Sequence, residues 1–338
     1  MSSLHLALCL ACRRALISIA VVGFAACGGS TPVPDAAPTH IPTSAVGTFA
    51  ITSTIDLHVP AAAEPALATL LAATDGPDDP ARYLVDRLIA ALPDGSVKKL
   101  ATAAAPFVAA YVNERLADIA PRFTAGLNGL AIGLARVATH LGTVETLRID
   151  DGGTGIRTIT GVRFEVGGGV TVVPLGSAGL PELAAGVRVT LDAAGHLGIS
   201  EHEHALPYGA LLRLGLDRAV ARSVEPTAGD LAGALDGLLD CDRLGHVIAE
   251  RVGFGSPVVY GAACRAAMTA VASEVDARLA AIDQTPLGIE VAGSAIGYDG
   301  DGDGAMDEIN AGRWTGAVYS GDYREPIDAA SFLGETAR

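Results

Sequence analysis

Aromatic side chains are scarce in this chain, which has 7 Phe, 7 Tyr and 1 Trp among its 338 residues. Half of the residues, 50%, are nonetheless hydrophobic, so the core must be built mainly from Ala, Leu, Val and Ile. The scarcity argues against a carbohydrate-binding face, because such faces use the broad rings of Trp and Tyr. A compositional bias of the genome would produce the same pattern.

Basic residues are also few, since 23 Lys and Arg stand against 38 Asp and Glu, a net charge of −15. We therefore expect no nucleic-acid partner, because phosphate contacts need clustered Lys and Arg. Electrostatic docking on anionic lipid is disfavoured for the same reason.

Familiar catalytic motifs are missing. The sequence contains no HExxH, no P-loop and no GxGxxG that precedes a helix. Ser256 follows Gly-Phe-Gly and Ser200 precedes Glu-His, so neither serine lies in the GxSxG turn of a hydrolase. We therefore expect a protein without catalytic activity.

An apolar run covers residues 15–26, after Arg13 and Arg14, and is shorter than the about 20 residues that span a bilayer. The run leads into Phe24-Ala25-Ala26-Cys27. These residues resemble the lipobox of bacterial lipoproteins, in which small residues precede a cysteine that is acylated. The resemblance implies that residues 1–27 are a signal peptide and that Cys27 carries lipid such as palmitate. The acyl chains would anchor the protein to a membrane of the cell envelope.

Two other fates of this segment stay open. Ordinary signal peptidase cleavage near Ala26 would give a secreted protein, and an uncleaved segment would stay in the membrane as an anchor. Removal of residues 1–27 takes away two arginines and no acids, which changes the net charge from −15 to −17.

The remaining chain divides into a tether and a folded part. Residues 28–45 are rich in Pro, Gly, Ser and Thr, a composition typical of a flexible linker. Residues 46–330 are expected to form one α+β domain, and a division near residue 205 is the alternative.

Alternating apolar residues predict strands in several parts of the chain. They indicate an N-terminal strand over 46–59 and an antiparallel meander over 143–204. Two more strands are predicted around 287–291 and 314–318, joined by an acidic loop. The predicted fold is an antiparallel sheet of these long strands, packed on two groups of helices.

Helical spacing covers 64–141 and 207–283. Its clearest stretch repeats every three or four residues, beside Gly126, Gly129 and Gly133: Phe123, Leu127, Leu130, Leu134, Val137 and Leu141. Glycine in a helix costs about 1 kcal/mol relative to alanine. Three of them indicate close packing against a neighbouring helix or strand, or against a ligand.

Only two cysteines, Cys241 and Cys264, follow Cys27. An even pair in an exported protein predicts a disulfide, with free thiols or a metal pair as the alternatives. Closing a loop of about 24 residues would stabilise the fold by roughly 3 kcal/mol.

The strongest candidate site is the acidic loop 299–310, DGDGDGAMDEIN, which has the oxygen spacing of an EF-hand loop. The loop resembles the calcium loops of dockerins and thrombospondin type 3 repeats, since its flanks are predicted strands and Asn stands at position 12. The resemblance implies a structural calcium ion, and a solvated acidic hairpin tip is the alternative. The implied ligands are Asp299, Asp301, Asp303, the carbonyl of Ala305, Asp307 and Asn310.

A second candidate is Glu201-His202-Glu203-His204. On a strand, His202 and His204 point to one face about 7 Å apart, a spacing that can hold zinc. His196 would share this face, but no third ligand is evident. A polar strand end is the simpler interpretation, and zinc is not expected.

These observations predict a cell-envelope lipoprotein without catalytic activity, with a structural calcium loop. It would bind lipid or another apolar small molecule, an expectation that rests on analogy with sheet-and-helix lipid carriers. The alternatives are a structural or adhesive surface protein and a metal-assisted hydrolase.

Overall fold

The computed structural model describes residues 40–57, 80–92, 94–285, 287–321, 323–327 and 329–337, all within the unit Pro38–Arg338. The predicted signal peptide 1–27, with Cys27, and most of the predicted tether 28–45 lie outside these residues. Among the helices that are described, none is long and apolar enough to cross a membrane.

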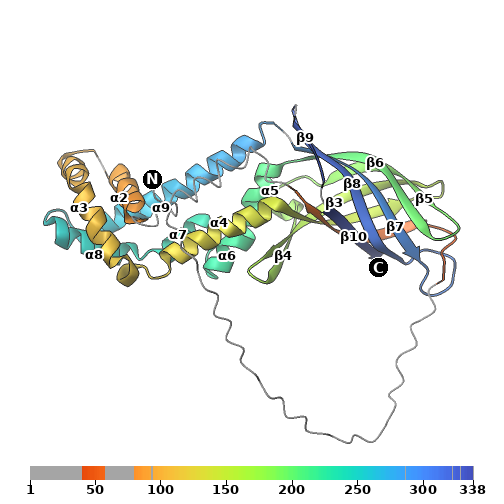
Figure 1. Cartoon of the computed structure of the whole chain (residues 1–338), viewed down its shortest axis with the longest axis horizontal. Helices are drawn as coiled ribbons and strands as arrows, with labels where there is room; N and C mark the ends of the chain where they lie inside the picture. Colours follow the sequence, from red (N-terminus) through yellow and green to blue (C-terminus); the bar gives the residue numbers. More distant parts are fainter. Residues whose placement is uncertain are drawn as a thin grey trace, which may run out of the picture. The chain divides into compact units, whose positions relative to one another are not determined.

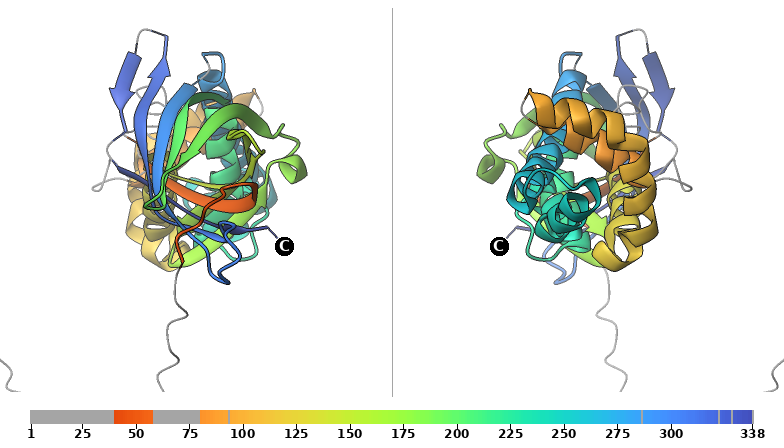
Figure 2. Two further views of the ribbon diagram at one scale, coloured as in Figure 1. Left: turned by 90° about the vertical axis from the view of Figure 1, so that its right-hand side faces the viewer. Right: turned by 90° about the vertical axis from the view of Figure 1, so that its left-hand side faces the viewer.

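Eight antiparallel strands close into a barrel (Figures 1 and 2). The whole sheet has ten strands among the described residues: β1 (Gly47–Asp56), β2 (His140–Ile149), β3 (Thr154–Val166), β4 (Gly169–Pro174), β5 (Leu183–Leu191), β6 (His196–Leu206), β7 (Leu287–Tyr298), β8 (Glu308–Ser320), β9 (Tyr323–Pro326) and β10 (Ala329–Thr336). The ring runs β10-β1-β2-β3-β5-β6-β7-β8, and β8 pairs back to β10. Strands β4 and β9 lie off the ring, paired with β3 and β8.

The barrel interior is a core because side chains alternate between the two faces of each strand. In β1, the inward residues are fully buried and the residues between them are exposed or half-buried; the inward set is Phe49, Ile51, Ser53 and Ile55. The prediction of an α+β fold with an antiparallel sheet is confirmed. The structure is more specific than this prediction, since the sheet closes into a barrel and encloses its own core.

The helices form a second group, connected to the barrel through its strands (Figure 1). They are α2 (Pro80–Ala91), α3 (Ser96–Ile119), α4 (Phe123–Thr139), α5 (Tyr208–Gly215), the π-helix η2 (Leu216–Val220), α6 (Ala221–Val224), α7 (Leu231–Leu238), α8 (Cys241–Val252) and α9 (Pro257–Ile282), with the 3₁₀ turn η1 (Gly176–Ala178) between β4 and β5. Helix α9 packs against α2, α5, α7 and α8. Cys241 and Cys264 form the predicted disulfide between α8 and α9, with a Cα–Cα distance of 5.5 Å.

Close packing of α4 explains two of its glycines. A Cβ on Gly126 would lie 2.3 Å from the Leu238 side chain of α7, and one on Gly133 would lie 2.5 Å from Val220 of η2. The predicted contact with a neighbouring helix is therefore confirmed. The predicted helix to residue 141 is too long, because α4 ends at Thr139 and its apolar stripe continues directly into strand β2.

Polar contacts join helix α5 to α4 and to the end of α9. The Tyr208 hydroxyl at the start of α5 donates to the carbonyl of Ala138, at 2.5 Å. The carboxylate of Asp283 accepts from the backbone N–H groups of Gly209 and Ala210, at 2.7 and 2.9 Å. Asp283 thus satisfies two N–H groups at the N-terminus of α5 that have no partner within the helix.

Candidate functional site

The acidic loop joins β7 to β8 and brings three of its carboxylates together. Carboxylate oxygens of Asp299, Asp301 and Asp307 all lie within 4.8 Å of one another. Asp299 is only 2% exposed, whereas Asp301 is exposed and Asp307 is half-buried. Clustered carboxylate oxygens are the ligands that calcium prefers, and a cation would relieve the repulsion among these like charges.

Backbone geometry shapes the loop around Asp299. Gly302 and Gly304 adopt φ values of +81° and +92°, a left-handed conformation that favours glycine. Their N–H groups donate to the two carboxylate oxygens of Asp299, at 2.6 and 2.8 Å. Burial raises the pKa of Asp299, but these hydrogen bonds outweigh it and hold the pKa below its ordinary value.

Three other predicted calcium ligands make contacts of their own in the loop and at its end. The Asp303 carboxylate accepts from the backbone N–H of Ala305, at 2.7 Å. Asn310 lies in β8 opposite Ile296, and its side-chain amide donates to the Glu308 carboxylate at 3.1 Å. Ala305 pairs with Ser44 in an isolated bridge. Three of the six predicted ligands are thus carboxylates that lie close together, and calcium binding by the six stays a prediction.

Both ends of the folded chain meet at the loop. At the N-terminal end, His40 exchanges two backbone hydrogen bonds of 3.0 Å with Asp299, and Ser44 accepts from Met306 at 2.9 Å. At the other end, Thr336 donates to the Asp307 carbonyl through its N–H at 2.8 Å and through its hydroxyl at 2.9 Å. The loop therefore holds the first and last described segments against the same hairpin.

The two histidines lie inside the barrel. A bulge in β6 places Ser200 and Glu201 opposite one residue of β7 and shifts the alternation, so that His202 and His204 are 7% and 3% exposed. His196 precedes the bulge and is exposed. The expectation that His196 shares their face is therefore wrong, and the histidines are not a solvated strand end.

A buried ion pair faces His202. Glu145 of β2 and Arg157 of β3 are 1% and 2% exposed, and the guanidinium donates to both carboxylate oxygens, at 2.5 and 2.7 Å. The Thr143 hydroxyl also donates to Glu145. Burial raises the pKa of the Glu145 carboxyl. The Arg157 charge and these hydrogen bonds lower it by more, so the pKa lies below the ordinary value.

Hydrogen bonding defines the protonation state of His202. Its Nδ1 lies 2.8 Å from the Ser200 carbonyl oxygen and must donate, because a carbonyl only accepts. Its Nε2 lies 2.8 Å from Nη1 of Arg157 and must accept, because guanidinium only donates. His202 is therefore neutral, and neither ring nitrogen is free to bind zinc.

His204 has no such partners. Its Nε2 is buried and has no hydrogen-bond partner among the described residues, and its ring meets that of His202 edge-on at 5.5 Å. Burial, then the positive charge of Arg157, lower the pKa of His204 to about 4. The two histidines thus do not converge on a common metal position.

Trp314 of β8 completes this interior cluster. The Arg157 guanidinium lies 4.1 Å from the centre of the Trp314 ring, a cation–π contact, and Phe332 stacks on the ring at 4.2 Å. The indole N–H donates to the Ser53 hydroxyl at 3.1 Å. We call Glu145, Arg157, His202, His204 and Trp314 the barrel cluster.

The barrel wall is open next to Trp314. Strand β8 pairs with β10 at Arg313–Ser331 and with β9 at Ala317–Pro326. Between those points Gly316 accepts from the N–H of Ile327, and among the described residues Trp314 and Thr315 have no ladder partner on this side. A groove of about 720 Å³ occupies the gap. It is lined by Thr54, Asp56, residues 311–316, Ile327 and residues 329–331.

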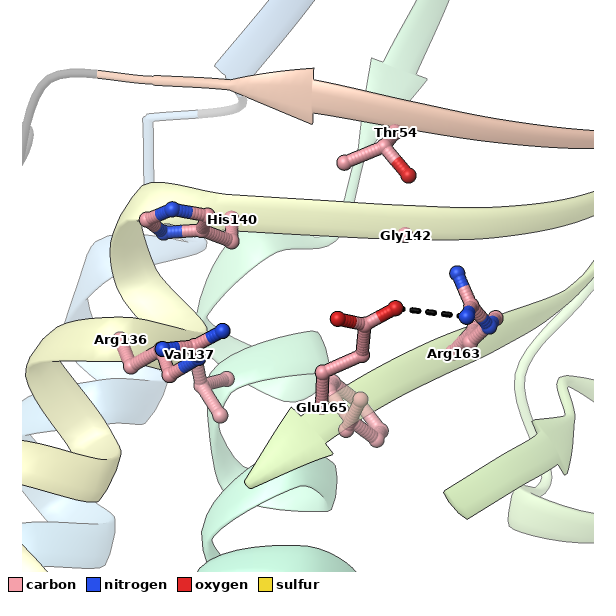
Figure 3. Close-up of a pocket in the computed structure, with 8 residues that line it drawn as sticks. Thr54, Arg136, Val137, His140, Gly142, Arg163 and Glu165 are labelled. Atoms are coloured by element: carbon pink, nitrogen blue, oxygen red, sulfur yellow. Dashed lines mark ion pairs between the residues drawn. The ribbon is translucent and has the colours of Figure 1, made fainter. Parts of the chain in front are cut away.

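A smaller pocket lies where α4 enters β2 (Figure 3). Its volume is about 30 Å³, which leaves room for no more than a water or two. Figure 3 shows the ion pair between Arg163 and Glu165 on its wall, with an N–O distance of 2.6 Å. The pocket is therefore too small to hold a substrate.

Three members of the barrel cluster, Glu145, Arg157 and Trp314, are not predicted from the sequence. A usable signal exists for Glu145, because it occupies an inward position of an alternating strand between Thr143 and Leu147. A charged residue at such a position must have a buried partner.

Comparison of the chain with protein-family models, with curated proteins and with solved structures finds no match. The functional argument therefore depends on the geometry of the acidic loop and of the barrel cluster.

Proposed function

We propose that this chain is a lipid-anchored protein of the cell envelope, without catalytic activity, whose acidic loop binds a structural calcium ion where the tether joins the barrel. The observation that carries the proposal is the meeting of three elements at one hairpin. Asp299, Asp301 and Asp307 supply closely spaced carboxylates. Residues 40–44 and Thr336 are hydrogen-bonded to the same loop.

A calcium ion at this position would stabilise the hairpin. It would neutralise Asp299, Asp301 and Asp307 and so stiffen the hairpin to which both ends of the folded part are bonded. Because residues 40–44, at the end of the predicted tether 28–45, are bonded to the loop, such a hairpin would transmit any pull from the membrane anchor to the barrel. The barrel interior is filled by buried side chains and gives no support to a ligand held there.

Calcium binding is tested by thermal unfolding of the processed protein with 10 mM calcium and with chelator. Loops of extracellular modules bind calcium with dissociation constants of about 10⁻⁴–10⁻³ M, so this concentration should stabilise the fold by about 1–3 kcal/mol. Asp301→Asn should abolish the difference. Asp151→Asn removes an exposed acid from another hairpin turn and should leave it intact. Equal unfolding temperatures with and without calcium would refute the calcium site.

Lipid anchoring is tested separately, by fractionation of cells that express the full chain or its Cys27→Ala variant. The acidic chain has little attraction for anionic lipid, so the variant should leave the membrane fraction while the unchanged chain stays there. A variant that remains on the membrane would show that acylation of Cys27 is not the anchor.

A further inference from the structure

We propose that the barrel cluster is an acid-operated switch, in which protonation of His202 breaks its contact with Arg157 and loosens Trp314 beside the gap between β8 and β10. The proposal is independent of calcium and of the lipid anchor. It depends on the hydrogen bonds, charges and burial of five side chains inside the barrel.

In the first step, Nε2 of His202 changes from a hydrogen-bond acceptor to a donor. At neutral pH, Nε2 of His202 accepts from Nη1 of Arg157 at 2.8 Å. When Nε2 takes a proton from solvent, it carries a hydrogen and shares a positive charge with Nδ1, so two cationic donors face each other. Nδ1 keeps its bond to the Ser200 carbonyl, which holds the ring in place. Arg157 must therefore move.

The charges around the histidines do not compensate for an added proton. Among the described residues, Arg157 from β3 and Glu145 from β2 are the buried charged side chains beside the histidines, and they already neutralise each other. The residues opposite His202 and His204 on β7 are Val291 and Ile289, which carry no charge. His204 adds a second imidazole beside the first.

Burial lowers the pKa of both imidazoles, and the Arg157 charge lowers it further. Both rings are consequently neutral near pH 7 and gain protons only in acid. Protonation should therefore begin below pH 6.5, the ordinary histidine value, with His204 titrating near pH 4 in the closed barrel.

Movement of Arg157 would reach the barrel wall through Trp314. The guanidinium covers one region of the indole ring at 4.1 Å, and Trp314 lies in the groove at the gap in the wall. Gly312 and Gly316 flank it in β8 and line the same groove, and the Phe332 ring that stacks on the indole lies against Gly312. Loss of the cation–π contact would expose the indole to water through this gap.

The chain carries its own reporter, because Trp314 is its only tryptophan. The test measures Trp314 emission and acrylamide quenching on the processed protein from pH 8 to pH 3, together with far-UV circular dichroism. We expect a reversible shift to longer wavelength and stronger quenching below pH 6.5, with the circular dichroism unchanged. A fluorescence change that appears only together with loss of circular dichroism would overturn the proposal.

Two glutamine variants assign the change. His202→Gln keeps a neutral acceptor for Arg157 but cannot gain a proton, so the fluorescence transition should disappear or move to lower pH. His196→Gln, on the exposed face of the same strand, should retain the transition of the unchanged protein. A transition that is the same in all three proteins would overturn the role of His202.

A measurement on the unchanged protein covers the case in which His202→Gln does not fold. Hydrogen exchange at the imidazole C2 position, followed by mass spectrometry, reports the pKa of each histidine. We expect His202 to titrate below pH 6.5, the ordinary histidine value, and in step with the Trp314 signal. Titration of His202 at or above pH 6.5, or apart from the Trp314 signal, would refute the switch.

Discussion

The acidic loop and the barrel cluster handle charge in opposite ways. The loop gathers three carboxylates at a partly exposed hairpin, and none of the three forms an ion pair with a Lys or Arg among the described residues. The barrel cluster buries one acid and one base that satisfy each other through two short hydrogen bonds. The loop is thus a charge imbalance that a cation from outside could correct, whereas the cluster is balanced and is disturbed by any added charge.

This difference predicts different responses to the environment. A cation should strengthen the loop, whereas a proton should strengthen the repulsion inside the barrel. Removal of one acid should therefore have opposite effects at the two places. In the loop it reduces the repulsion among the carboxylates, whereas in the barrel it leaves an unpaired cation.

The largest effect should follow Glu145→Gln. The variant leaves the Arg157 guanidinium buried without a countercharge, which typically costs about 3–5 kcal/mol. Urea unfolding at pH 7.5 measures the loss. The double variant Glu145→Leu, Arg157→Met should lose less than Glu145→Gln, because no charge remains buried. If the double variant loses as much stability as Glu145→Leu and Arg157→Met lose in sum, the two residues do not act as a pair.

How far these features can be predicted from sequence depends on the range of the contacts that create them. His202 and His204 share one face because they are two residues apart on a strand, and this local relation is predicted correctly. The bulge at Ser200 and Glu201 depends on pairing with β7, a strand about 90 residues later in the chain, so the position of His196 is predicted wrongly.

Closure of the barrel is a similar case. Strand β10 pairs with both β1 and β8, and this double pairing turns the sheet into a ring. The sequence of β10, AASFLGET, alternates too weakly to predict a strand, so its role depends on edges supplied by distant residues. The acidic loop is local in the chain and is located correctly, but its contacts with residues 40–44 and Thr336 are not predictable from its own spacing.

The second prediction concerns stability in acid. The pKa of His204 is about 4 in the folded protein and 6.5 in an unfolded chain. The unfolded state therefore binds a proton first, and stability that is fully present above pH 6.5 should fall by about 3 kcal/mol as the pH approaches 4. Urea unfolding at pH 7.5 and pH 4.5 measures this loss, and His204→Leu should remove most of it. Glu145, with its lowered pKa, loses its contribution only at still lower pH.

The third prediction is that Asp301→Asn changes the unfolding temperature in opposite directions with chelator and with calcium. Asp301→Asn removes one of three like charges, so with chelator present the variant should unfold at a slightly higher temperature than the unchanged protein. With 10 mM calcium it should unfold at a lower temperature, because the unchanged protein gains about 1–3 kcal/mol from the ion. Thermal unfolding of both proteins in both buffers measures the crossing. Curves that keep the same order in both buffers would contradict a shared cation position.

The smallest effect should come from Glu165→Gln, which is the matched comparison for Glu145→Gln. Both variants neutralise an acid that pairs with an arginine of β3, but Glu165 and Arg163 lie at the small pocket with side chains 47% and 27% exposed (Figure 3). Water solvates the arginine that remains, so the loss should be below about 1 kcal/mol. Urea unfolding under the same conditions gives both values. If Glu165→Gln destabilises as strongly as Glu145→Gln, burial is not what makes the barrel cluster sensitive to charge.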